Sequence, residues 1–262
     1  MHIRVLGCHG ADCLVDATEG PVRQESCGFL IDDSVLLDAG TIGTRLTLAE
    51  QRRIRFVLLS HLHFDHIKGL PLLVDNLAEQ FVAPVTVAAT KPVIQGLIDH
   101  VFNDQVYPNF FKLPDRERPV MQAQVLHPGK PVMLDHLEVI PVSVNHTVPT
   151  VGYIVKDRGA ALLYSGDTYQ TDEIWSLGRM TPELKAVFLE SSFPDEMGQL
   201  AKKSKHLTPS LFLKEFQKLE RPDLPIYAYH MKPEFHHRIE EQISRLGIKR
   251  VAFLAEEQIV TL

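Results

Sequence analysis

A segment rich in metal-ligating side chains follows an apolar run at residues 54–59. Its members are His61, His63, Asp65 and His66. Imidazole nitrogens and carboxylate oxygens are the ligands that zinc and similar divalent ions accept. In an extended chain His61 and His63 point the same way, because side chains alternate between two faces. Asp65 and His66 lie one turn further along and can face a second ion. The spacing predicts a metal site; the alternative is a polar loop whose histidines occur by chance.

Other side chains with nitrogen or oxygen ligand atoms each follow a predicted strand. They are His146 after 138–144, Asp167 after 160–164, Glu190 after 186–189 and His230 after 225–229. The strand at 54–59 leads into the 61–66 segment in the same way. A site of this kind collects its side chains from strand ends along one edge of a rigid scaffold. We therefore expect all of these residues to lie together.

Short apolar runs alternate with amphipathic stretches along the rest of the chain. Further strands are expected at 2–7, 27–31, 35–37, 84–88, 151–155 and 250–254, with a loop or irregular hairpin at 11–25. Helices are expected at 41–51, 67–80, 91–102 and 233–246, and another begins at 208–209 with threonine as N-cap and proline next. This order predicts an α/β fold with αββα layers: two mixed sheets packed face to face, with helices outside.

Residues 103–136 interrupt that pattern with prolines and aromatic side chains. We expect an irregular segment that leaves the core near the active site. Its aromatic side chains need somewhere to pack, and a small separate hydrophobic cluster is one interpretation. The other is a wall of the substrate pocket, in which Tyr107, Asn109 and Phe110 are the candidate residues.

The bulk properties restrict the class of protein. A chain of 262 residues with 45% hydrophobic and 23% charged residues suits one globular domain spanning 1–262. The net charge of −6 does not favour a grip on long nucleic acid, which usually needs a basic excess. Three cysteines imply no disulfide framework, and no apolar run has the length of a membrane span. We expect a cytoplasmic protein with no membrane partner, for which a homodimer is one option.

The pattern His61-x-His63-x-Asp65-His66 resembles the signature of the metallo-β-lactamase fold. The resemblance implies two metal ions that share one bridging carboxylate. The implied ligands are His61, His63 and His146 at one ion, Asp65, His66 and His230 at the other, and Asp167 at both. Because these donors are nitrogen and oxygen without a thiolate, we expect zinc, with manganese or iron as alternatives. Asp38 would support the histidine loop in this family, although a turn-capping role is compatible with its position.

Four local sequences together resemble the class II cyclic-nucleotide phosphodiesterases. They are Ser60–Gly69, His146–Tyr153, Glu190–Phe193 with His206–Pro209, and His230–Pro233. The family hydrolyses 3′,5′-cyclic nucleotides such as cyclic AMP and cyclic GMP to 5′-nucleotides, with a hydroxide held between the two ions. Phe64 stands where leucine is more usual and Met231 where isoleucine is, and both are apolar exchanges.

The resemblance also gives Glu190 and His206 a role, which places them with Asp65 as candidate catalytic residues. His206 is not needed as a metal ligand, and Glu190 could hydrogen-bond its ring and raise its pKa. We expect His206 to protonate the ribose 3′-oxygen as it leaves, a general acid effect worth about 10²–10⁴-fold. The alternative is that His206 only helps Thr208 to cap the following helix.

Two other functions are compatible with the same residues. A tRNA 3′-processing endonuclease of the RNase Z type shares the ligand set, but the acidic balance fits its large RNA substrate poorly. A metal-dependent nucleotide-binding protein without catalysis is the second alternative. A full dinuclear ligand set with a bridging carboxylate argues against it, because binding alone does not need one.

Overall fold

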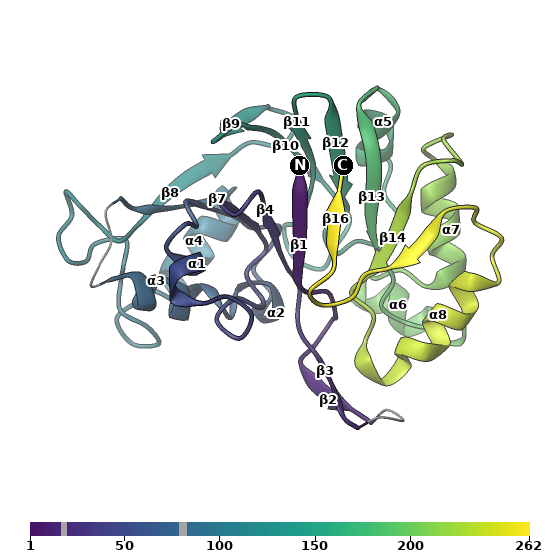
Figure 1. Cartoon of the computed structure of the whole chain (residues 1–262), viewed down its shortest axis with the longest axis horizontal. Helices are drawn as coiled ribbons and strands as arrows, with labels where there is room; N and C mark the ends of the chain where they lie inside the picture. The colour runs from purple at the N-terminus through teal and green to yellow at the C-terminus, as the bar shows by residue number, and fades with distance from the viewer. Residues whose placement is uncertain (17–19, 79–82) are drawn as a thin grey trace.

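Two seven-stranded sheets pack face to face, and helices cover their outer faces (Figure 1). The structure is a computed structural model, and it describes residues 1–16, 20–78 and 83–262. The expected αββα sandwich of mixed sheets is confirmed. The strands are β1 His2–Gly7, β2 Cys13–Val15, β3 Val22–Gln24, β4 Gly28–Ile31, β5 Val35–Leu37, β6 Phe56–Leu58, β7 Val85–Thr90, β8 Met121–Leu126, β9 Val132–Leu134, β10 Leu137–Ser143, β11 Val151–Asp157, β12 Ala160–Tyr164, β13 Leu184–Glu190, β14 Ile226–Tyr229, β15 Val251–Phe253 and β16 Ile259–Thr261. The helices are α1 Leu48–Gln51, α2 Phe64–Ile67, α3 Leu70–Ala78, α4 Lys91–His100, α5 Glu173–Arg179, α6 Gly198–Ser204, α7 Pro209–Gln217 and α8 His236–Ser244, with 3₁₀ turns η1 Asp195–Met197 and η2 Pro233–Phe235.

The two sheets have the same internal plan. The first has the order β16-β1-β4-β5-β6-β7-β8, antiparallel as far as β5 and parallel from β5 to β8. The second has the order β15-β14-β13-β12-β11-β10-β9, parallel from β15 to β12 and antiparallel from β12 to β9. Because β12, β13 and β14 run parallel, their carboxyl ends meet at one edge of the second sheet, where ligands of such sheets commonly bind.

Three apolar clusters correspond to the three interfaces between layers. The inner cluster joins the facing sides of the two sheets, where the rings of Phe29 and Phe188 lie 5.5 Å apart. A second cluster packs α3 and α4 against the first sheet, and a third packs α5, α7 and α8 against the second. The sheets are thus covered on both faces, and burial of this kind contributes roughly 25 cal/mol per Å² of apolar surface. This packing holds the strand ends, and the side chains that follow them, in fixed positions.

Some element boundaries differ from the sequence expectation. The helix expected at 41–51 is only the four residues of α1, because Thr47 and Glu50 form a capping box that starts the helix after Thr47. The helix expected at 67–80 is split into α2 and α3, and residues 79 and 80 lie outside the described residues. The terminal strand β16, which pairs with β1, was not expected.

The expectation for 103–136 is wrong over its second half. Residues 121–134 contain β8 and β9, which pair with β7 and β10 at the edges of the two sheets. The prolines suggested an irregular segment, but Pro119, Pro128 and Pro131 lie between strands. There the missing N–H of proline costs no hydrogen bond of the sheet. Residues 103–120 are irregular, as expected. In the part of the chain that the structure describes, no helix has the length and apolar character needed to cross a membrane.

Candidate active site

The histidine segment after β6 is held by one buried carboxylate, Asp38. Asp38 accepts hydrogen bonds from the backbone N–H and the hydroxyl of Ser60, both at 2.8 Å, and from the hydroxyl of Tyr164 at 2.6 Å. Its Oδ2 also lies 2.8 Å from Nδ1 of His66. Asp38 has a left-handed φ of 54°, a conformation that costs about 1–3 kcal/mol and persists only where the surroundings fix it. The expected support of the histidine loop by Asp38 is therefore a contact in the structure.

The opposite side of the site comes from the second sheet and uses different supports. Nδ1 of His146 donates to the carbonyl of Lys205 at 3.0 Å, and Nζ of Lys205 donates back to the carbonyl of His146 at 3.0 Å. His230 has a left-handed φ of 63° and its Nδ1 lies 2.9 Å from the hydroxyl of Ser192. Each ring thus has one nitrogen engaged away from the centre, which leaves Nε2 to face inward.

The inward nitrogens and one carboxylate converge on a small volume. Nε2 of His146 lies 3.1 Å from Nδ1 of His63, and Nε2 of His66 lies 3.2 Å from Nε2 of His230. Two nitrogens on one tetrahedral zinc lie about 3.3 Å apart, given Zn–N distances of about 2.0–2.1 Å. His61, His63, His146 and Asp167 offer ligand atoms within 4.8 Å of one another. The structure therefore brings the two sides of the predicted metal site together.

Asp167 stands between the two groups of histidines. Its Oδ2 is 3.2 Å from Nε2 of His230, 3.4 Å from Nε2 of His66 and 3.7 Å from Nε2 of His61. Asp65 approaches from the rim, with Oδ2 3.4 Å from Nε2 of His230. Nε2 of His61 and Oδ1 of Asp167 are buried and have no hydrogen-bond partner among the described residues. Such atoms are costly to leave unpaired, so the donor set fits divalent metal binding.

The pKa values of the site histidines bear on whether their rings can coordinate a metal, because only a ring nitrogen without a proton can do so. Burial lowers the pKa of His61, His63 and His146, which keeps their rings neutral and able to coordinate. Burial also lowers the pKa of His66, but the charges of Asp167 and Asp38 outweigh it and raise that pKa well above its ordinary value. Metal binding at His66 would therefore displace a proton and should weaken at low pH.

His206 and Glu190 lie beside this centre as a hydrogen-bonded pair. Nδ1 of His206 is 2.8 Å from Oε1 of Glu190, whose side chain is fully buried. The His206 ring stacks on the His230 ring with centroids 5.3 Å apart and planes 17° apart. Burial lowers the pKa of His206, but the Glu190 charge and hydrogen bond outweigh it and raise the pKa above its ordinary value. Glu190 also accepts from the Thr168 and Leu207 backbone, so His206 is held by a buried, well-connected carboxylate.

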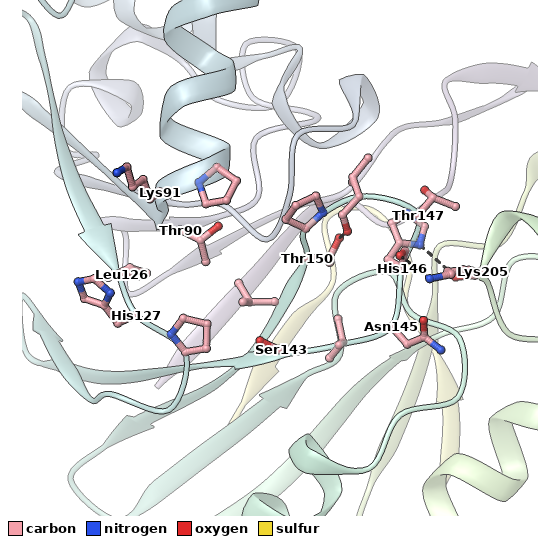
Figure 2. A pocket seen from close by; sticks show the side chains of 16 residues that line it. Thr90, Lys91, Leu126, His127, Ser143, Asn145, His146, Thr147, Thr150 and Lys205 are labelled. Carbon is pink, nitrogen blue, oxygen red and sulfur yellow. Dashed lines mark hydrogen bonds between the residues drawn. The ribbon is translucent and has the colours of Figure 1, made fainter.

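A cavity of about 610 Å³ adjoins His146, within the usual range for small-molecule sites. Thr90 and Lys91 lie on one side of it, and Asn145, His146 and Thr147 lie on the other (Figure 2). Lys205 and His127 add further polar groups to the lining. The lining of the cavity is mixed in polarity, as expected beside a site that binds a polar molecule.

The residues suggested for the substrate pocket lie elsewhere. Phe110 is 6% exposed and belongs to the apolar cluster of the first sheet, and Tyr107 packs against that cluster. Asn109 is buried as well, and its backbone N–H donates to Asp104. Tyr107, Asn109 and Phe110 are absent from the described lining of the cavity beside His146. The rings of Tyr107 and Phe110 thus belong to the main apolar cluster of the first sheet, so neither the small separate cluster nor the pocket wall considered from the sequence describes them.

Sequence reasoning missed several supporting residues. Ser192 contacts both His206 and His230 through its hydroxyl, and its position two residues after the strand end at Glu190 was the available signal. The Cys27 thiol also offers an atom within 4.8 Å of ligand atoms of His66 and His230. Burial raises the pKa of Cys27 well above its ordinary value, so it is a neutral neighbour of the site.

Comparisons with known proteins agree with this fold. A model of the β-lactamase superfamily domain matches residues 33–239. A Yersinia pestis protein named probable 3′,5′-cyclic-nucleotide phosphodiesterase is 26% identical over 216 residues, which cover 73% of this chain and 61% of that protein. An Aliivibrio fischeri 3′,5′-cyclic-nucleotide phosphodiesterase is 27% identical over 282 residues, covering 86% of this chain and 82% of that protein. The crystal structure of unliganded yeast PDE1 superposes with a TM-score of 0.80 at 20% identity, covering 100% of this chain and 99% of that chain. The match to the Yersinia pestis protein thus spans less than two thirds of that relative.

Proposed function

The chain belongs to the β-lactamase superfamily, and from this premise we propose that it is a metal-dependent phosphodiesterase that hydrolyses 3′,5′-cyclic nucleotides to 5′-nucleotides. The observation that carries the proposal is the His206–Glu190 pair stacked against His230, because a metal centre that only bound metal would not need it. The names of two relatives, cyclic-nucleotide phosphodiesterases of about a quarter identity, support the same substrate class.

We assign the inward donors to two divalent ions, with zinc first and manganese or iron as alternatives. His61, His63 and His146 would hold one ion, Asp65, His66 and His230 the other, and Asp167 both. The ions would activate a water molecule and neutralise charge on the phosphate, as dinuclear centres do. The protein's part is to hold the rings in place through Asp38, Ser192 and Lys205, which fix the ring orientations from behind.

His206 would supply the proton that the leaving group needs. In hydrolysis, the oxygen of water bonds to phosphorus and the bond from phosphorus to the 3′-oxygen breaks. The 3′-oxygen would leave as an alkoxide, which is a poor leaving group unless it is protonated as the bond breaks. Nδ1 of His206 is bound to Glu190, so Nε2 is the nitrogen free to carry the proton. The raised pKa of His206 keeps a larger fraction of the ring protonated near neutral pH.

The cavity beside His146 is the place we assign to the nucleoside. It lies next to the metal-facing rings, since His146 belongs both to its lining and to the site. Its volume of about 610 Å³ is ample for a base and a ribose. Thr90, Asn145 and Thr150 offer hydrogen-bonding groups in its lining. These residues replace Tyr107, Asn109 and Phe110 as the proposed contacts to the substrate.

A product assay tests the proposed function. Purified protein supplied with zinc or manganese should release 5′-AMP from 3′,5′-cyclic AMP, and Asp167→Ala should not. The panel includes cyclic GMP, a cyclic dinucleotide and a precursor tRNA. Cleavage of the precursor tRNA with cyclic AMP left intact would favour the RNase Z alternative. Binding of cyclic AMP in calorimetry without turnover by metal-loaded protein would favour a nucleotide-binding protein.

A further inference from the structure

A second pair of histidines lies outside the active site, between the loop after β1 and the start of α8. His9 is 3% exposed, and its ring lies against that of His236 with centroids 5.1 Å apart and planes 42° apart. The side chain of His236 is only 14% exposed, whereas that of its neighbour His237 is 85% exposed.

Each of the two rings is bound to a carboxylate through one nitrogen only. Nδ1 of His9 lies 2.8 Å from Oε1 of Glu256, and Nε2 of His236 lies 3.1 Å from Oε1 of Glu240. The other nitrogens, Nε2 of His9 and Nδ1 of His236, are buried and lack a hydrogen-bond partner among the residues described. A histidine that binds a metal characteristically donates its second N–H to a carboxylate, which fixes the tautomer. Both rings of this pair meet that description.

The ring separation is also that of two ligands of one ion. In the active site the His61–His146 and His66–His230 pairs have centroids 5.1 and 5.2 Å apart. Two imidazoles on a tetrahedral zinc have centroids about 5 Å apart, given Zn–N distances of about 2.0–2.1 Å. The 5.1 Å between His9 and His236 falls in this range. A direct hydrogen bond between the two rings does not explain the approach, because neither free nitrogen has a partner.

We propose that His9 and His236 bind a divalent transition-metal ion of the zinc type at a site separate from the active site. Nε2 of His9 and Nδ1 of His236 are the ligand atoms, and Glu256 and Glu240 orient the rings. The protein supplies two ligands and water supplies the others. The ion should therefore bind more weakly than one surrounded by protein ligands, and a mild chelator should remove it first.

The position of the site gives the ion a structural role. The loop that carries His9 is bonded to the segment that carries His230, because the His230 backbone N–H donates to the Cys8 carbonyl at 2.6 Å. The backbone N–H of Gly10 likewise donates to the Met231 carbonyl at 3.1 Å. An ion bound to His9 and His236 would therefore link the loop after β1 to the start of α8. Zinc should thus stabilise the folded state by mass action at this site.

The test compares the number of bound zinc ions in matched variants. Wild type, His9→Gln, His236→Gln and the exposed control His237→Gln are dialysed against the same free zinc concentration and analysed for zinc and protein. We expect His9→Gln and His236→Gln each to bind one zinc fewer than wild type, and His237→Gln to bind the same number. Equal zinc content in wild type and His236→Gln overturns the proposal.

Two further measurements keep the test independent of folding and of the active site. If His9→Gln does not fold, His236→Gln carries the comparison, because His236 lies at the start of a surface helix. The comparison is repeated in a protein with an impaired active site, by measuring zinc in Asp167→Ala and in the double variant Asp167→Ala/His236→Gln. The double variant should again bind one zinc fewer. In wild type, imidazole ¹⁵N spectra should show Nε2 of His9 and Nδ1 of His236 shifting on zinc addition. Unchanged signals at both nitrogens would contradict the proposal.

Discussion

The two sides of the active site are built in different ways. On the first-sheet side, four inward residues come from one short stretch, His61 to His66, and a single buried carboxylate, Asp38, orients it. On the second-sheet side, each inward residue comes from a different strand end. Their supports are also dispersed, with Lys205 behind His146, and Ser192 between His206 and His230.

The difference separates local from global preorganisation. The first side is the more local of the two, because its four inward residues lie between positions 61 and 66 and because Asp38 binds Ser60 and His66, which are 22 and 28 residues away from it. The second side depends on the register of β12, β13 and β14, which sets where Asp167, Glu190 and His230 emerge. The pair that we assign to proton transfer, Glu190 and His206, is found only on this dispersed side.

Removing the residue that joins the two sides should have the largest effect. Asp167→Ala deletes the carboxylate that faces His61, His66 and His230, so both metal content and phosphodiesterase activity should fall. We expect the activity to fall to the background level. This loss is larger than the roughly 10–100-fold loss that is typical when a residue that hydrogen-bonds a metal ligand is removed. Elemental analysis and a cyclic AMP assay measure this, with the exposed Asp99→Ala as control. Full activity with an unchanged metal content would contradict the bridging role.

Substitution of His206 should separate proton transfer from metal binding within the second side. His206→Ala should lower cyclic AMP hydrolysis by about 10²–10⁴-fold. It should largely spare bis-p-nitrophenyl phosphate, whose nitrophenolate leaves without a proton. Metal content should match wild type, because His206 is not among the assigned ligands. Equal losses on both substrates, or loss of metal, would make His206 a structural residue or a ligand.

Substitution of Asp38 probes the carboxylate that holds the histidine segment of the first side. Asp38→Asn keeps the shape but removes the charge that Ser60, His66 and Tyr164 contact, so metal affinity should fall about 10–100-fold. The variant should recover most of its activity at high metal concentration, unlike His206→Ala. A zinc titration monitored by activity measures the shift. An affinity like that of wild type would mean that Asp38 supports only the fold.

The smallest expected effect is a displacement of the pH profile. A general acid works only while it is protonated, so the rate on cyclic AMP should fall as pH rises through the pKa of His206. Burial lowers that pKa, and Glu190 more than compensates and raises it. Glu190→Gln removes the charge, and the fall should then begin at a lower pH. Rate profiles of wild type and variant at saturating metal measure this, and a shift to higher pH would contradict the pairing.

The same contrast explains how far the sequence could be read. His61, His63, Asp65 and His66 could be recognised from spacing, and the strand ends at His146, Asp167 and His230 from their order along the chain. The lining of the cavity could not, because Thr90 and Lys91 at the start of α4 meet Asn145 and Thr147 only through packing of the two sheets. Tyr107 and Phe110 looked functional because aromatic residues serve both as core and as binding surface, and burial decides between the two. His9 and His236 were each unremarkable alone, and their contact depends on tertiary structure.

The separation of the two sides along the chain bears on the order of events in folding. His66 and His230 are 164 residues apart, yet their ring nitrogens lie 3.2 Å apart. Contacts of such sequence separation form late, because a long loop must close before they contribute. A metal ion that needs both rings can bind only after the sheets have docked. Active-site metal should therefore slow unfolding and leave the folding rate almost unchanged, so that in denaturant-jump experiments only the unfolding arm of the chevron moves on metal removal.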